Sequence, residues 1–248
     1  MTTCKKIPKN RIQKWKLLLL ILVSLVILCT GGFLLYVNDY YPSGNAAAKA
    51  LISDTAVSVT KRADHAYIFK PESEISRGLV FYPGGKVEYT AYAPLMRDLA
   101  EQGWLCVLLK MPFHLAVLDA DAGDDIPDEF PQVDSWYIGG HSLGGSMAAS
   151  CVADDDDYDG LLLLASYSTS DLSKSGLKVF SIYGTEDHVL NMDNYQKYRK
   201  NLPADTRELV IEGGCHAYFG DYGIQEGDGI PSITAEEQIR QTVDFLKH

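Results

Sequence analysis

The sequence predicts an α/β fold in which a mostly parallel central sheet is flanked by helices and carries no cap domain. Segments with strand character alternate with helical segments through residues 50–248. Some strand segments are apolar without interruption, as in the four leucines at 161–164, which is typical of parallel strands buried on both faces. About 12 residues separate the strands that end at Ala165 and begin at Lys178, so we expect no cap domain there.

The expected elements follow this alternation in chain order. An antiparallel pair at 56–59 and 66–69 opens the sheet. The later strands, each a short run rich in apolar residues, are expected at 78–82, 104–110, 135–139, 160–165, 178–183 and 208–211. The helices, which have apolar residues at helical spacing, are expected at 89–102, 115–124, 143–153, 191–201 and 234–247.

The pentapeptide Gly-His-Ser-Leu-Gly at residues 140–144 carries the strongest functional signal. It lies between the strand at 135–139 and a helical segment rich in small residues. A chain that turns from strand to helix this tightly strains the serine backbone, and the flanking glycines remove Cβ atoms that would collide. We therefore predict a nucleophile elbow, with Ser142 as nucleophile and the N–H of Leu143 as an oxyanion donor at the helix N-terminus.

A serine nucleophile needs an imidazole base and a carboxylate that orients the base, here in the chain order Ser, acid, His. Asp187 follows the strand at 178–183, and His216 follows the strand at 208–211. Both therefore lie just past strand ends, where ligands bind in open α/β sheets. Glu186 is the alternative acid. None of the other five histidines combines this order with a loop after a strand and nearby glycines, so we predict Asp187 and His216.

A second oxyanion donor is expected from the Pro-Gly-Gly-Lys loop at 83–86, which follows the strand at 78–82. Its glycines let main-chain N–H groups approach a substrate carbonyl, and its proline has no N–H. Gly85 is the expected donor and Lys86 the next candidate. An ordinary glycine-rich turn is the alternative interpretation.

Four motifs together resemble the α/β-hydrolase superfamily, most closely its small, lidless, dienelactone-hydrolase-like members. The motifs are Phe-Tyr-Pro-Gly-Gly-Lys at 81–86, Gly-His-Ser-Leu-Gly-Gly at 140–145, Tyr-Gly-Thr-Glu-Asp at 183–187 and Gly-Gly-Cys-His at 213–216. The segment 216–223 is also similar to one bacterial, often membrane-anchored branch. The resemblance covers roughly residues 50–248. It implies nucleophile Ser142, acid Asp187, base His216 and oxyanion donors Leu143 and Gly85. Pro-Gly replaces the His-Gly of lipase-like oxyanion loops, which leaves the loop donor open.

Residues 17–37 carry no charge over 21 positions, and a helix of that length, at ~1.5 Å per residue, reaches about 31 Å, enough to cross a bilayer core. Six basic and no acidic residues precede it, which places the N-terminus in the cytosol by the positive-inside rule. We expect a basic cytosolic tail (1–16), a transmembrane helix (17–37), a linker (38–49) and an extracytoplasmic catalytic domain (50–248) at the cell membrane. A cleaved signal peptide, giving a secreted enzyme, is the alternative, although no small-x-small site directly follows the apolar stretch.

The charge distribution limits the classes of partner. All 33 acidic residues follow the apolar stretch, whereas six of the 22 basic residues precede it, leaving 16 basic residues in the remainder. Such an acidic surface repels nucleic acid, so we expect none as partner. The five cysteines have no metal-ligand spacing, and the four aspartates at 154–157 lack the spaced ligands and glycine of a calcium loop. No metal and no organic cofactor is expected.

These observations predict a serine hydrolase that cleaves a carboxylic ester or thioester through an acyl-enzyme intermediate. An amidase or transacylase with the same residues, or a non-catalytic membrane-tethered binding protein, are the alternatives. An open site suggests a small acyl group or one presented on a larger, surface-bound substrate. The expected pocket residues are Tyr82, Phe113, His114, Tyr218 and Phe219.

Overall fold

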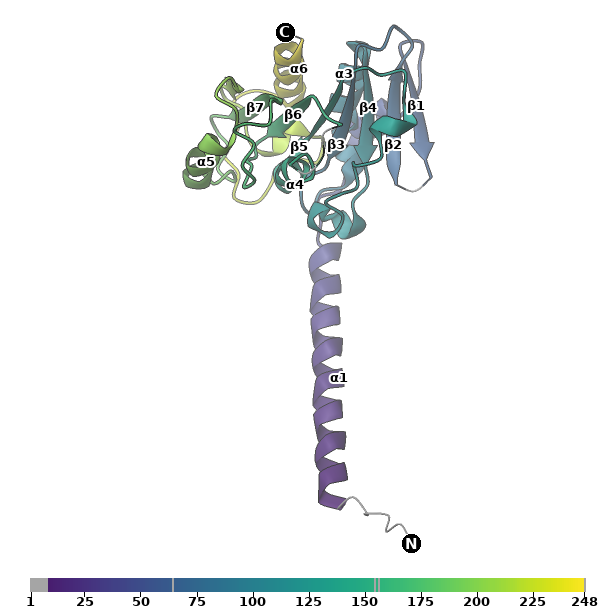
Figure 1. Cartoon of the computed structure of the whole chain (residues 1–248), viewed down its shortest axis with the longest axis vertical. Coiled ribbons are helices and arrows are strands. Elements are labelled where there is room, and N and C mark those ends of the chain that lie inside the picture. The colour runs from purple at the N-terminus through teal and green to yellow at the C-terminus, as the bar shows by residue number, and fades with distance from the viewer. Residues whose placement is uncertain (1–8, 64, 154, 156, 248) are drawn as a thin grey trace. The chain divides into compact units, whose positions relative to one another are not determined.

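The computed structural model describes residues 9–63, 65–153, 155 and 157–247, in two compact units that divide after Asp39 (Figure 1). The first unit contains one described helix, α1 (Lys9–Asn38). Its part from Lys14 to Asn38 is long and apolar enough to cross a membrane, judged by length and composition. The expected membrane segment, 17–37, lies within this helix.

The second unit begins at Tyr40, within the segment expected as a linker. Residues 45–50 form the short helix α2 (Asn45–Ala50), and its Ala47 and Ala50 side chains are buried. The Asp221 carboxylate accepts a hydrogen bond from the Ala47 N–H at 2.8 Å. The unit that carries the sheet therefore starts at Tyr40 rather than at residue 50.

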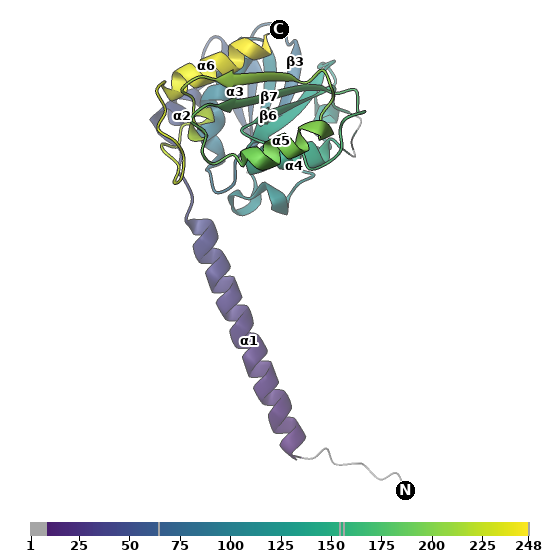
Figure 2. The same cartoon turned by 90° about the vertical axis from the view of Figure 1, so that its left-hand side faces the viewer.

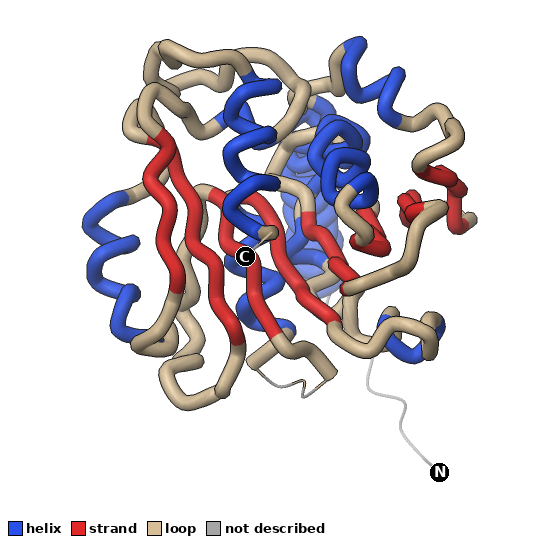
Figure 3. The backbone as a smooth tube through the Cα atoms, turned by 90° about the horizontal axis from the view of Figure 1, so that it is seen from above, coloured by secondary structure: helices blue, strands red, loops and turns tan. Residues whose placement is uncertain are grey.

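One eight-stranded sheet forms the centre of this unit, in the order β1-β2-β4-β3-β5-β6-β7-β8. The strands are β1 (Val57–Arg62), β2 (Ala66–Pro71), β3 (Arg77–Tyr82), β4 (Trp104–Leu109), β5 (Trp136–His141), β6 (Gly160–Leu164), β7 (Lys178–Gly184) and β8 (Arg207–Ile211). β1 pairs with β2 and β2 with β4 in the antiparallel sense, whereas all pairs from β4 to β8 are parallel. The six parallel strands therefore end at the same edge of the sheet. Figure 3 shows the strands of the sheet, in red, side by side with helices, in blue, packed around them.

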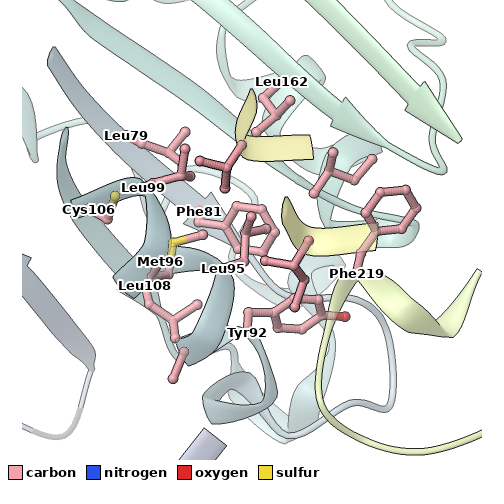
Figure 4. Close-up of a cluster of buried hydrophobic side chains, with 14 of the residues drawn as sticks. Leu79, Phe81, Tyr92, Leu95, Met96, Leu99, Cys106, Leu108, Leu162 and Phe219 are labelled. Carbon is pink, nitrogen blue, oxygen red and sulfur yellow. The ribbon is translucent and has the colours of Figure 1, made fainter. Parts of the chain in front are cut away.

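Helices cover both faces of the sheet because successive strand residues point to opposite sides. The helices are α3 (Ala93–Glu101), α4 (Leu143–Cys151), α5 (Met192–Tyr198) and α6 (Ala235–Leu246). Leu79 and Phe81 of β3 pack with residues of α3 and α6, whereas Val80 between them packs with residues of α4. Figure 2 shows α6 and α4 on opposite sides of β6 and β7. Figure 4 shows part of the core cluster on the α3 and α6 side of the sheet. Among its labelled residues are Leu79, Phe81, Leu95, Met96, Leu99, Cys106, Leu108 and Leu162.

The prediction of a helix at 115–124 is wrong. The chain there makes two 3-10 turns, Pro112–His114 and Ala116–Leu118. The phenol of Tyr82 donates to the Ala120 carbonyl at 2.9 Å and accepts from the Gly123 N–H at 2.8 Å. These tertiary hydrogen bonds engage main-chain groups that a helix would pair internally, so the apolar pattern alone did not decide the local structure.

Candidate active site

The elbow at Ser142 has the strand–turn–helix form that the sequence predicts. Ser142 lies between the last residue of β5 and the first residue of α4, with φ 53° and ψ −122°. This left-handed region is strained for a residue other than glycine. A Cβ on Gly140 would lie 2.5 Å from the Tyr82 carbonyl oxygen, and one on Gly144 would lie 2.3 Å from the Pro83 carbonyl oxygen. Both glycines are therefore required by the close approach of β3.

Asp187 and His216 form a buried pair at the carboxyl edge of the sheet. Asp187 follows β7 and His216 follows β8. His216 Nδ1 lies 3.1 and 2.9 Å from Asp187 Oδ1 and Oδ2, and each side chain is only 1% exposed. Nδ1–H donates to the carboxylate, so the lone pair of Nε2 is left to accept a proton. The structure thus pairs the predicted base with the predicted acid.

The Asp187 carboxylate is oriented by the main chain that follows it. Its Oδ1 accepts the N–H groups of Val189 at 3.0 Å and Leu190 at 2.8 Å. The alternative acid, Glu186, instead accepts a hydrogen bond from the Thr185 hydroxyl. The geometry therefore favours Asp187 as the partner of His216.

Ser142 and His216 line the same cavity, which has a volume of about 200 Å³. In the described part of the chain, His216 Nε2 is buried and has no hydrogen-bond partner. Hydrogen bonds between nucleophile and base are often long in unliganded sites. The remaining lining residues are Leu143, Ser146, Ala165, Ser166, Tyr167, Val189, Leu190 and Asn191. Larger cavities, of about 370 and 510 Å³, lie elsewhere and include neither Ser142 nor His216.

The loop at 83–86, which is expected to supply the second oxyanion donor and is called the oxyanion loop below, leaves one main-chain N–H, that of Gly85, without a partner among the described residues. The Gly84 N–H donates to the Tyr92 hydroxyl at 3.1 Å, and the Lys86 N–H donates to the His114 carbonyl at 2.9 Å. Both amides are therefore already engaged, including that of the second candidate, Lys86. A Cβ on Gly85 would lie 3.0 Å from Cδ2 of Leu143, so these two residues face each other. Leu143 is the first residue of α4, where a main-chain N–H has no partner within the helix.

The five expected pocket residues do not line the cavity at Ser142. Tyr82 and Phe219 are fully buried in the core. Phe113 is 53% exposed, and the His114 ring stacks on the Tyr40 ring at 4.1 Å. Tyr218 packs, partly buried, against the core. The expectation failed because nearness to a motif in sequence does not determine to which side a loop residue points.

Asp228 is a residue of this site that the sequence did not reveal. Its Oδ1 accepts the N–H of His216 at 3.1 Å, and its Oδ2 accepts the N–H of Ala217 at 2.9 Å. Oδ1 also lies 3.4 Å from the N–H of His188, in the loop that carries Asp187. One carboxylate thus ties the acid loop to the base loop. The available signal was an aspartate between two glycines, at 227–229.

A second unpredicted contact links the oxyanion loop to the elbow. Tyr92 accepts the Gly84 N–H and donates its hydroxyl proton to His141 Nδ1 at 2.8 Å. The His141 ring lies 4.5 Å from the His216 ring. Burial, and secondly the neighbouring His216, lowers the pKa of His141 well below its usual value. His141 is therefore neutral and supports the site through hydrogen bonding rather than charge.

One cluster of potential metal ligands occurs among the described residues, formed by Asp124, Cys151 and Asp155. None of the three lines the cavity at Ser142. The Cys151 thiol donates to Asp124 at 3.0 Å, and burial above all raises its pKa to about 12. The cluster is therefore held together by a thiol–carboxylate hydrogen bond, apart from the cavity at Ser142.

Comparison with known proteins places this geometry in a family. The Alpha/beta hydrolase family matches the sequence over residues 78–240. No curated protein sequence matches the chain. Among solved structures, TT1662 from Thermus thermophilus is similar with a TM-score of 0.57 and 16% identity, over 77% of this chain and 97% of that one.

Two further solved structures are similar, with comparable TM-scores and sequence identities. Esterase 2 of the planctomycete Thermogutta terrifontis has a TM-score of 0.51 and 16% identity, over 77% of this chain and 91% of that one. A putative α/β hydrolase of Agrobacterium tumefaciens, ATU1826, has a TM-score of 0.54 and 14% identity, over 77% and 94%. At these identities the structural likeness establishes the fold, and the match over residues 78–240 establishes the family. The chain belongs to the α/β-hydrolase family.

Proposed function

We propose that this protein is a serine hydrolase that cleaves a carboxylic ester or thioester through an acyl-enzyme intermediate. The observation that carries the proposal is the buried Asp187–His216 pair, whose imidazole lines one cavity with the elbow serine Ser142. Each of the three residues follows the carboxyl end of a parallel strand, so the topology brings them to one edge of the sheet.

The reaction has two steps in this proposal. Ser142 Oγ attacks the substrate carbonyl while His216 Nε2 accepts its proton, and the carbonyl oxygen becomes an oxyanion held by the N–H groups of Leu143 and Gly85. The oxyanion collapses, the leaving alcohol or thiol takes the proton from His216, and an acyl-serine remains. Water, deprotonated by His216, then attacks the acyl carbonyl, which releases the acid and restores the serine.

The cavity supports a small acyl group. Its volume of about 200 Å³ is below the ~300–1,000 Å³ of pockets for drug-sized ligands. Ser146 and Ser166 line it with hydroxyls bonded to each other at 3.1 Å, whereas Val189 and Leu190 provide apolar surface. Hydrolysis rates of p-nitrophenyl esters should therefore fall as the acyl chain lengthens beyond a few carbons. Rates that rise steadily to long chains would contradict the small-acyl assignment.

A structural neighbour suggests a direct probe. Esterase 2 of Thermogutta terrifontis is known phosphorylated by paraoxon and phosphoramylated by tabun. We expect this protein to react likewise with a fluorophosphonate, because an activated serine attacks phosphorus esters as it attacks carbonyls.

The test compares labelling of the full-length wild type with that of Ser142→Ala and Ser146→Ala. Ser146 is the matched control because it is a second serine of the same cavity. Wild type and Ser146→Ala should be labelled, and Ser142→Ala should not. A wild type that never reacts would remove the enzyme proposal, whereas labelling of Ser142→Ala would show that the nucleophile lies elsewhere.

For the location, we propose that α1 anchors the enzyme in the cell membrane with the sheet-containing unit outside. The apolar segment and the six preceding basic residues support this orientation. Protease added to intact cells should then degrade the catalytic unit. Complete protection until the cells are lysed would contradict the orientation.

A further inference from the structure

The segment between α1 and α2, residues 40–44, is bonded to the oxyanion loop; we call it the strap. The Tyr41 N–H donates to the Lys86 carbonyl at 2.7 Å, and the Glu88 N–H donates to the Tyr41 carbonyl at 2.9 Å. These two bonds form a parallel β-bridge between Tyr41 and Val87. The strap therefore extends the oxyanion loop by main-chain pairing.

Side chains reinforce this bridge. The N–H and the hydroxyl of Ser43 both donate to Glu88 Oε2, at 3.0 and 3.1 Å. The Thr90 hydroxyl donates to the Ser43 hydroxyl at 3.0 Å. Glu88 is thus held by the strap through both its main chain and its carboxylate.

The other edge of the strap is bonded to the segment that follows His216. The Glu226 N–H donates to the Tyr41 hydroxyl at 3.0 Å, and the Gly44 N–H donates to the Asp221 carbonyl at 2.7 Å. The strap therefore connects the loop that supplies the oxyanion donor with the chain that leads away from the base.

The oxyanion loop needs such support because its backbone is strained. Lys86 has φ 59°, a left-handed conformation that costs a residue other than glycine about 1–3 kcal/mol. Its N–H is held by the His114 carbonyl, and its own carbonyl is held by the strap. Lys86 directly follows Gly85, so holding the Lys86 backbone on both sides restrains the end of the segment that presents the Gly85 amide beside Leu143.

We propose that the strap positions the oxyanion hole, with Tyr41 and Ser43 as positioning residues that act through Glu88 and Lys86. The inference rests on the proposed function, because it concerns the same site. The segment that follows α1 thereby contributes to activity, because it positions the oxyanion hole.

This role has a consequence for processing. The three alanines at 46–48 have the composition of a signal-peptidase site. Ala47 is buried in α2, and cleavage next to it would detach the strap from the enzyme. We therefore expect the active enzyme to retain the strap.

The test uses full-length Glu88→Ala, which removes the acceptor of both Ser43 donors, and Tyr41→Pro, which removes the N–H that binds Lys86. Glu74→Ala is the matched control, because it removes an exposed carboxylate from the segment between β2 and β3, outside the strap and the oxyanion loop. Active sites are first counted by fluorophosphonate labelling, so that misfolded protein does not enter the rates. The values of kcat and KM and the inhibition constant of an aryl trifluoromethyl ketone are then measured; its hemiketal oxyanion occupies the oxyanion hole.

Loss of one oxyanion donor lowers kcat by roughly 100–1,000-fold, so a misaimed donor in Glu88→Ala should lower kcat about tenfold or more. The inhibition constant should rise by a similar factor, with KM little changed. Strap variants that melt earlier but keep the wild-type kcat per active site and inhibition constant would overturn the proposal. A wild type that is never labelled would instead refute the proposed function, and the strap proposal with it.

Discussion

The elbow and the oxyanion loop lie side by side but are held in place in different ways. Ser142 is placed by its immediate neighbours, because β5, two glycines and α4 define the turn. The oxyanion loop at 83–86 depends on residues outside it, namely Tyr92 eight residues on and the more distant Tyr41 and His114. The elbow is therefore encoded by a contiguous motif, whereas the oxyanion loop is held by contacts that form only when the domain folds.

The largest expected effect is on the locally encoded half. Gly144→Ala would place a Cβ 2.3 Å from the carbonyl oxygens of Tyr82 and Pro83. These are main-chain atoms and cannot swing away, so we expect the proposed esterase activity to fall about 1,000-fold or more, as well as destabilisation of at least ~1–3 kcal/mol. Initial rates on a p-nitrophenyl ester and a urea unfolding curve measure the two effects.

Gly32→Ala is the control for that substitution, because a Cβ at Gly32 of α1 meets nothing within 4 Å. It should keep wild-type activity. An active Gly144→Ala would mean that the elbow tolerates rearrangement and is not fixed by its own glycines.

Asp228→Ala tests the long-range support of the base. The N–H groups of His216 and Ala217 would lose their acceptor, and a displacement of about 1 Å in a catalytic group costs on the order of 100-fold. We expect kcat to fall about 10–100-fold with little change in KM. Asp228→Asn, which keeps one acceptor oxygen, should fall between this variant and wild type.

Glu226→Ala is the matched control, because it removes a carboxylate two residues from Asp228. Glu226 bonds to Tyr41 through its main-chain N–H, which the substitution keeps. Equal loss in Glu226→Ala and Asp228→Ala would assign the effect to loop charge and not to positioning of His216.

Tyr92→Phe tests the hydrogen bonds by which Tyr92 joins the oxyanion loop to His141. It leaves the Gly84 N–H and His141 Nδ1 without the hydroxyl that joins them. A buried donor left unpaired costs about 1–3 kcal/mol, and we expect kcat to fall several-fold, less than in Asp228→Ala. Tyr67→Phe, on β2, should change neither stability nor kcat. A Tyr92→Phe variant with wild-type rates would show that the oxyanion loop keeps its conformation without the Tyr92 hydroxyl.

The smallest effect concerns pH. The pKa of His141 is lowered in the folded state, so below its usual value of 6.5 the unfolded chain binds a proton that the folded chain does not. Stability is therefore complete above about pH 6.5 and falls as the pH drops below it, with a slope of up to about 1.4 kcal/mol per pH unit. Urea unfolding between about pH 5 and pH 7.5 should show this slope in wild type and a shallower one in His141→Gln. If the unfolding free energies of wild type and His141→Gln changed equally with pH, a neutral, buried His141 would be contradicted.

The pKa of Asp98 is shifted so that stability changes with pH in the opposite direction. Wild type must therefore be compared with His141→Gln rather than read alone. Burial, together with Glu101 and Glu236, raises the pKa of Asp98 to about 6. The folded chain then holds a proton that the unfolded chain has lost, so its contribution is present at low pH and disappears as the pH rises through about 6. Because Asp98 is unchanged in both proteins, the difference between wild type and His141→Gln isolates the histidine.

Much of the fold could be predicted from the chain. The strands at 78–82, 160–165 and 178–183 were found within about one residue, because each is a short run rich in apolar residues, as expected of buried parallel strands. The segment at 115–124 could not be predicted, since Tyr82 takes up its main-chain groups from another element. The strap was missed for a similar reason, because nothing in the local pattern of residues 40–44 indicates a bridge to Val87.

The sequence by itself determined the family, the elbow and the chain order of Ser142, Asp187 and His216, because these depend on local geometry and on strands that run in one direction. Tertiary structure alone decided which residues line the cavity, which loop amide remains available and what holds the base in place. Those properties depend on the direction of individual side chains and on hydrogen bonds between distant segments, and a carboxylate such as Asp228 acquires its donors only when the loops that carry them meet.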